Sequence, residues 1–151
     1  MAKLIVKHKK ELSDGNVYAL LRYAPNKEEM ANILGSENIS KLNNGNVYEL
    51  LSNATSKDEM AKLLVKHKKE LSDGNVYALL RYAPNKEEMA NILGSVNINK
   101  LSDKNLYTLL HYTSKKEEMA NILGSENISK LSSDRVYHLL SNATNKDEIK
   151  N

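Results

Sequence analysis

The stretch LSDGNVYALLRYAPNKEEMANILGSENISK, residues 12–41, decides the fold because related copies of it fill the chain. Further copies follow in tandem, the last of them truncated, and a partial copy precedes them: residues 42–70, 71–100, 101–130, 131–151 and 1–11. A fixed period in this range is typical of arrays whose units stack to bury apolar faces that no unit can bury alone. The sequence therefore predicts a single elongated domain over residues 1–151.

Each copy predicts two short helices joined by a tight turn. In the first copy Ser13 is a helix-capping residue, and apolar side chains recur after it at helical spacing. We expect the first helix over residues 14–23, because Pro25 disfavours helical backbone at the residue before it. Asn26, three residues before Glu29, marks the start of the second helix. The same pair recurs in other copies: Ser56 with Glu59, Asn85 with Glu88, and Asn145 with Glu148.

The second helix of each copy is predicted to end at a glycine in a left-handed conformation, the usual C-terminal signal. These glycines are Gly35, Gly94 and Gly124. The second copy lacks the glycine, so its second helix is expected to run on to about Lys69. In the fourth copy, the expected cap moves to Ser114.

These patterns predict an all-α fold, a right-handed α-solenoid or superhelix of about five two-helix repeats of roughly 30 residues. Helices this short are marginal alone, so packing between repeats must stabilise them. The half-repeat at the start exposes Leu4, Ile5 and Val6, and we expect self-association through exposed repeat ends.

The composition fits a folded domain that binds a partner. Of the 151 residues, 40% are hydrophobic and 27% are charged, and the net charge is +3. The absence of cysteine excludes disulfides and cysteine metal ligands. No apolar run approaches the roughly 18 residues of a membrane span, so we expect no membrane partner and an intracellular, cytoplasmic location. The mild positive charge permits an anionic partner without requiring one.

The sequence offers no constellation for catalysis. The histidines have no metal-ligand spacing, so we expect no metal and no cofactor; they are His8, His67, His111 and His138. Paired acids open the second helix of every copy: Glu28-Glu29, Asp58-Glu59, Glu87-Glu88, Glu117-Glu118 and Asp147-Glu148. Acids in a first helical turn complement the helix dipole, and an active site would not be copied five times. We therefore expect a protein that is not an enzyme.

One tyrosine occupies the same place in every first helix: Tyr18, Tyr48, Tyr77, Tyr107 and Tyr137. We expect these rings to pack between helices, with hydroxyls reaching solvent or a backbone carbonyl. A ladder for base stacking is the alternative.

Two basic runs, residues 7–10 and 66–69, lie two repeats apart. They fit phosphate contacts and solvated helix ends equally well.

The copies differ most around the turn between their two helices. If the turns line up along one edge, varied residues on a constant frame are typical of partner recognition, and drift at unconstrained surface sites is the alternative. The candidate turn residues are Arg22, Tyr23, Ala24, Ser52, Asn53, Ala54, Arg81, Tyr82, Ala83, His111, Tyr112, Thr113, Ser141, Asn142 and Ala143.

The second copy carries a motif around this turn. It opens with Leu42, reads VYELLSNA over residues 47–54, and places Lys57 and Met60 in the second helix. This motif resembles the repeat of transcription-activator-like effectors (TALE-like repeats), in which a turn residue reads one base in the DNA major groove and a lysine contacts phosphate. The likeness covers about the first twenty positions of every copy, but this chain lacks the family's glycine pair in the turn.

The resemblance implies double-stranded DNA as partner and, for an effector, delivery into a host cell or nucleus. The base-facing residues it implies are Ala24, Ala54, Ala83, Thr113 and Ala143. Their supporting neighbours are Tyr23, Asn53, Tyr82, Tyr112 and Asn142. The implied phosphate contacts are Lys27, Lys57, Lys86, Lys116 and Lys146.

We therefore expect a non-enzymatic binding protein that holds nucleic acid along its aligned turns. The alternatives have the same architecture: a scaffold that binds a peptide or partner helix, or a structural array that assembles end to end. Lysines near the turns and the basic runs favour nucleic acid, whereas the acids beside each lysine favour a protein.

Overall fold

The structure is a computed structural model that describes residues 2–9 and 11–141. Over these two ranges every regular element is a helix, which confirms the all-α prediction. The chain divides into two compact units, Met1–Asn75 and Val76–Asn151.

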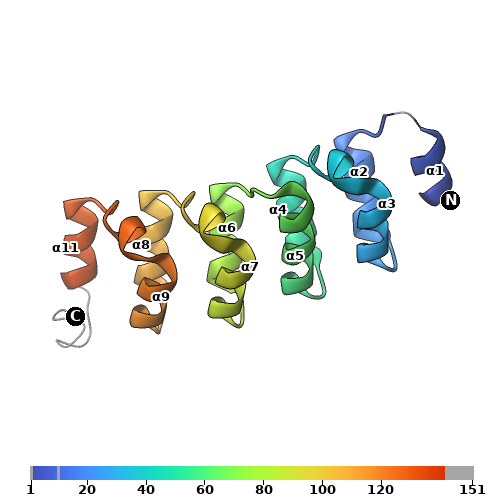
Figure 1. The fold of residues 1–151 in the computed structure, drawn as a ribbon. Helices are drawn as coiled ribbons and strands as arrows, with labels where there is room; N and C mark the ends of the chain where they lie inside the picture. Colours follow the sequence, from blue (N-terminus) through green and yellow to red (C-terminus); the bar gives the residue numbers. More distant parts are fainter. Residues whose placement is uncertain (1, 10, 142–151) are drawn as a thin grey trace. The chain divides into compact units, whose positions relative to one another are not determined.

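The first unit contains helical hairpins that pack on one another (Figure 1). Its helices are α1 (Ala2–His8), α2 (Asp14–Tyr23), α3 (Lys27–Ile39), α4 (Asn44–Asn53) and α5 (Lys57–Lys68). α2 pairs with α3 and α4 pairs with α5, while α2 also packs on α4 and α3 on α5. Each helix of these two hairpins thus contacts both its hairpin partner and its counterpart in the other hairpin.

The second unit repeats this pattern with the third to fifth copies. Its helices are α6 (Asp73–Tyr82, which begins just before the division), α7 (Lys86–Ile98), α8 (Asp103–Tyr112), α9 (Lys116–Leu123), α10 (Ser125–Ile128) and α11 (Ser133–Ser141). α9 packs on α7 and α8, and α11 packs on α8. The first helices therefore begin and end where the sequence predicts: residues 14–23 of the first copy match α2.

The core of each unit consists of the apolar positions that recur in every copy. The valine or leucine near the middle of the first helix is fully buried in the first four copies: Val17, Val47, Val76 and Leu106. Its counterpart in α11, Val136, is 39% exposed. The methionine of each second helix is also buried: Met30, Met60, Met89 and Met119. Burying one such side chain contributes about 1.5–3 kcal/mol, so repetition of these positions supplies most of the driving force for folding.

Polar side chains cap most helices as predicted. The Ser13 hydroxyl accepts a hydrogen bond from the Asn16 amide at 3.1 Å, and the Asn16 side chain accepts one from the Ser13 amide at 3.2 Å. The second-helix caps form in the first three copies, at Asn26, Ser56 and Asn85. The Asn145 cap lies outside the described residues.

The cap predicted at Ser114 is wrong. α9 begins at Lys116, as its counterparts begin at lysine, because burial of Met119 fixes the register of the helix. The cap position is therefore Lys115, which makes no side-chain cap hydrogen bond. Ser114 lies one residue too early, and the Lys115 amide instead donates to the Thr113 hydroxyl at 3.3 Å.

α3 and α7 break at Gly35 and Gly94 but do not stop there, whereas α9 ends at Leu123 with Gly124 as its C-cap, as predicted, and the short helix α10 follows. Gly35 has φ 77° and ψ 166°, so its positive φ is as predicted, but its ψ is extended and one further helical turn follows. The break leaves the Leu34 carbonyl without a helical partner, and the Asn38 side chain donates to it at 2.8 Å. Asn97 and Asn127 make the same bond in their own copies and are buried.

The second copy behaves as predicted where it lacks the glycine. α5 runs without a break to Lys68, and Lys69 ends it with a positive φ of 67°.

The surface of α1 is more open than that of its equivalent in α5. Leu4 is 56% exposed and Ile5 is 39% exposed, whereas Leu64, the counterpart of Ile5, is fully buried. Self-association through this surface stays a prediction. Within the described ranges, the helices are too short and too polar to cross a membrane.

Candidate binding edge at the helix-helix turns

In each unit, the turn edge comprises the last residues of each first helix and the turn that follows. Its most exposed large hydrophobic side chains are tyrosines: Tyr23 is 74% exposed, and Tyr82 and Tyr112 are 64% exposed. Ala83, by contrast, is buried, and its counterparts Ala24, Ala54 and Thr113 are half-buried. The structure therefore presents the residues predicted as supports more openly than those predicted to face a base. Asn142 and Ala143 lie outside the described residues.

The lysine that opens each second helix folds back onto the turn. The Lys27 ammonium donates to three carbonyl oxygens at the end of α2: Leu21 at 3.0 Å, Arg22 at 2.5 Å and Ala24 at 3.3 Å. These carbonyls belong to the last turn of α2 and its C-cap, where a positive charge is favourable. This contact gives the lysine a structural reason to recur in every copy.

The equivalent lysines in the other copies make the same contact, but the number and length of their hydrogen bonds differ. Lys86 and Lys116 each donate to three carbonyls, with shortest distances of 2.6 Å and 2.8 Å. Lys57 makes only two long contacts, at 3.4 Å and 3.5 Å. Burial lowers the pKa of Lys86, an effect that nearby Glu118 opposes. Phosphate contact by these lysines stays a prediction, and Lys146 lies outside the described residues.

Arginine and tyrosine pair at this edge in the first and third copies. The Arg22 guanidinium donates to the Tyr18 hydroxyl at 2.8 Å and lies 5.5 Å from the Tyr23 ring centre. Arg81 likewise donates to the Tyr77 hydroxyl. These hydrogen bonds raise the pKa of both guanidinium groups and hold them in place.

In the second unit the pairing extends across copies. The Arg81 guanidinium lies 5.4 Å from the ring centre of Tyr82 and 4.8 Å from that of Tyr112, in the next copy. His111 meets the Tyr112 ring edge-on at 4.6 Å. We call this set the aromatic–arginine cluster: Tyr77, Arg81, Tyr82, His111 and Tyr112.

The five equivalent tyrosines do not share one environment. Tyr18, Tyr77 and Tyr107 are half-buried, as expected, beside an arginine or histidine one helical turn later. The hydroxyls of Tyr18 and Tyr77 accept from arginine rather than reaching a backbone carbonyl. Packing is a wrong prediction for Tyr48 and Tyr137, which are 51% and 69% exposed. A small serine follows each of them at the same spacing and leaves the ring uncovered.

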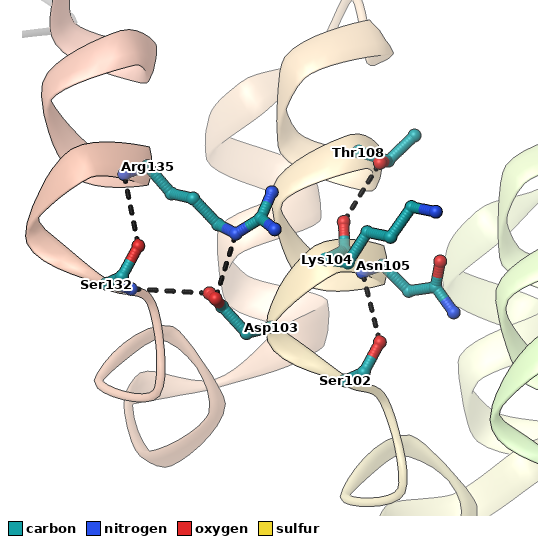
Figure 2. A network of polar contacts seen from close by, with 7 residues as sticks. All are labelled: Ser102, Asp103, Lys104, Asn105, Thr108, Ser132 and Arg135. Atoms are coloured by element: carbon teal, nitrogen blue, oxygen red, sulfur yellow. Dashed lines mark hydrogen bonds and ion pairs between the residues drawn. The ribbon is translucent and has the colours of Figure 1, made fainter.

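A polar contact joins the starts of successive first helices, at the opposite end of these helices from the turns (Figure 2). The Asp103 carboxylate at the start of α8 accepts from the Ser132 amide at 3.3 Å and from the Arg135 guanidinium at 2.8 Å. In the first unit Asp14 accepts from the Asn43 amide at 3.3 Å and from the Asn46 side chain at 2.9 Å. Sequence reasoning missed this aspartate, although its recurrence 29 to 32 residues before polar partners was a usable signal.

The basic run at residues 66–69 has structural contacts. The Lys68 ammonium donates to the Leu42 carbonyl at 2.9 Å, and His67 Nδ1 lies 3.0 Å from the Ser36 hydroxyl. Burial, followed by the charge of Lys66, lowers the pKa of His67. In the other run, residues 7–9 are exposed.

Within residues 2–9 and 11–141, no group of three acidic or histidine side chains is arranged to hold a metal ion. Comparison of the chain with protein-family models, with curated proteins and with solved structures found no match.

Proposed function

We propose that this chain is a non-enzymatic binding protein that holds nucleic acid along the turn edge. The observation that carries the proposal is the exposed tyrosine beside a positioned guanidinium, as in Tyr23 with Arg22 and Tyr82 with Arg81. Tyrosine and arginine are the residues that most often dominate binding interfaces. For nucleic acid, the ring supplies a stacking surface and the guanidinium a phosphate contact.

The proposed architecture is a right-handed α-solenoid of about five repeats. Hairpins that contact their counterparts in the next copy, as α2 contacts α4 and α8 contacts α11, support it. The resemblance to TALE-like repeats favours DNA, and an intracellular location follows from such a partner. Small-angle X-ray scattering in solution tests the architecture, because an extended array predicts a maximum dimension well beyond that of a sphere of equal mass.

A protein partner is the second candidate, favoured by a groove between α7 and α9. The groove has a volume of about 760 Å³, and its lining is acidic and rich in amides, with Glu87, Glu117, Glu118, Asn91 and Asn121. A basic peptide segment is the complementary partner for such a lining.

Fluorescence anisotropy at 50 mM and 200 mM salt tests the main proposal, with duplex DNA, single-stranded DNA and RNA as probes. We expect binding at 50 mM salt that weakens as salt increases, because phosphate contacts release counterions. The double substitution Arg22→Gln with Arg81→Gln should weaken binding and reduce the salt slope by roughly two. Lys62→Gln, an exposed change on the second-helix surface, is the matched control and should have little effect.

No binding to any probe at 50 mM salt would overturn the proposal. Binding of a lysine-rich peptide in its place, lost on Glu117→Gln with Glu118→Gln, would instead support the groove as the functional site.

A further inference from the structure

We propose that Tyr82 and Tyr112 form a base-stacking clamp for single-stranded nucleic acid, with Arg81, which contacts both rings, as the phosphate contact. This inference rests on the proposed function and specifies its partner. It assigns a binding role to the aromatic–arginine cluster of the second unit.

The geometry places two open aromatic rings next to one fixed cation. Arg81 lies over the Tyr82 ring of its own copy and the Tyr112 ring of the next, with centroid distances of 5.4 Å and 4.8 Å. Its hydrogen bond to the Tyr77 hydroxyl fixes the guanidinium. Both rings remain 64% exposed, so ring surface is left for a ligand to cover.

The charge at the clamp suits a phosphate. The groups that act on the Arg81 charge are Tyr77, Tyr82 and Tyr112. Among the described residues, no carboxylate lies within ion-pair distance of this guanidinium. The cation is therefore not neutralised by a neighbouring acid and is available to an external anion.

Aromatic faces select a single strand over a duplex. In a duplex each base already stacks on its neighbours, whereas unpaired bases stack on exposed aromatic side chains. An acidic peptide could satisfy Arg81, but it would leave the two tyrosine rings without a stacking partner. The combination therefore favours nucleic acid over protein.

The first unit provides an internal comparison because it has the arginine but lacks the clamp. Arg22 pairs with Tyr23, but the next copy has Asn53 in the position of Tyr112 and Glu49 in the position of Thr108. Glu49 acts on the charge of Arg22, and the Asn53 side chain donates to Glu49. This site has neither the second ring nor an unopposed cation.

The loss-of-function test uses the full chain with fluorescein-labelled oligo(dT) and the same sequence as a duplex. Tyr82→Ala and Tyr112→Ala should each weaken oligo(dT) binding about 5- to 150-fold, the range for removing one stacked base contact, and leave duplex binding within twofold. Tyr112→Phe should keep the affinity, because the ring remains. Tyr137→Ala, which removes a ring of similar exposure outside the clamp, should have no effect.

The gain-of-function test copies the clamp into the first unit. The double variant Glu49→Thr with Asn53→Tyr places a ring and a neutral side chain beside Arg22. We expect it to bind oligo(dT) at least fivefold more tightly than the parent chain.

The outcomes separate this inference from the proposed function. Oligo(dT) binding that survives both alanine substitutions would overturn the clamp. Duplex binding without single-strand binding would also overturn it. Either outcome would leave the proposed nucleic-acid binding function standing. Competition by poly-glutamate as effective as by unlabelled oligo(dT) would assign the cluster to an acidic protein and overturn the clamp. Absence of binding to every nucleic acid at 50 mM salt would overturn both.

Discussion

Replacing Lys27 with methionine tests whether the recurring lysine stabilises the turn of its own hairpin. Methionine keeps the apolar stem and removes the ammonium, so loss of packing contributes little to the effect. The ammonium donates to the carbonyls of Leu21, Arg22 and Ala24 at 3.0, 2.5 and 3.3 Å. The substitution leaves these oxygens to water alone.

The expected loss follows from the number and quality of these bonds. A hydrogen bond to a charged group contributes about 1.5–3 kcal/mol net, but here three bonds share one half-buried ammonium and water replaces part of them. We therefore expect Lys27→Met to lower the free energy of unfolding by about 2–3 kcal/mol. Lys57 makes two contacts of 3.4 and 3.5 Å, so Lys57→Met should cost only about 1 kcal/mol.

Urea denaturation followed by circular dichroism at 222 nm measures both variants. Lys27 and Lys57 lie in the same unit, so the comparison concerns one cooperative region. Lys62→Met, an exposed change on α5, is the control and should stay within about 0.5 kcal/mol of the parent. Equal losses for Lys27→Met and Lys57→Met, or a loss below about 0.5 kcal/mol for Lys27→Met, would refute the capping role.

Three further predictions concern the frame. Gly35→Ala should lower the free energy of unfolding by about 1–3 kcal/mol, because alanine is strained at φ 77° even though its Cβ meets no neighbouring atom. Gly74→Ala, inside a helix, should leave stability unchanged or increase it. Differential scanning calorimetry measures both variants, and equal effects would contradict the prediction. Asp103→Asn should lower the free energy of unfolding, measured by urea denaturation, by about 1 kcal/mol at low salt and by less at 1 M salt, because salt screens its ion pair with Arg135. Asp134 is exposed, and Asp134→Asn should have no measurable effect. A loss for Asp103→Asn that does not depend on salt would argue against the ion pair. The pKa of His67, measured by NMR, should lie below the ordinary histidine value of 6.5, because burial disfavours the charged ring. As pH falls below about 6.5, the unfolded chain takes up the proton before the folded chain does, so the stability that neutral His67 contributes to the fold is lost. A pKa above 6.5 would refute the burial argument.

The helices were predictable because each copy carries its own start and stop signals. The capping serine and the apolar spacing place α2 at residues 14–23, and the missing glycine lengthens α5. The extra turn after Gly35 was not predictable from the glycine alone. It depends on Asn38 reaching back to the Leu34 carbonyl, a contact visible only once the break has formed.

The candidate site was less predictable, for a physical reason. The sequence predicts a phosphate contact for a lysine at the first position of a helix. Whether its ammonium points outward, however, depends on the conformation of the turn before it. Here the turn brings the end of α2 within reach of Lys27, and the carbonyls there attract the charge. The pairing of Tyr18 with Arg22, by contrast, follows from their spacing of one helical turn and could have been predicted.

Differences between copies therefore do not all point to recognition. Asn43 and Asn46 give way to Ser132 and Arg135 three copies later, yet both pairs satisfy an equivalent aspartate, so this variation preserves packing. The change from asparagine in the second copy to Tyr112 in the fourth maintains no such contact and instead places a second open ring beside a cation. In a repeat protein, variation can create a specific site where it changes the exposed surface. By that criterion we propose that the third and fourth copies hold the functional part of the turn edge.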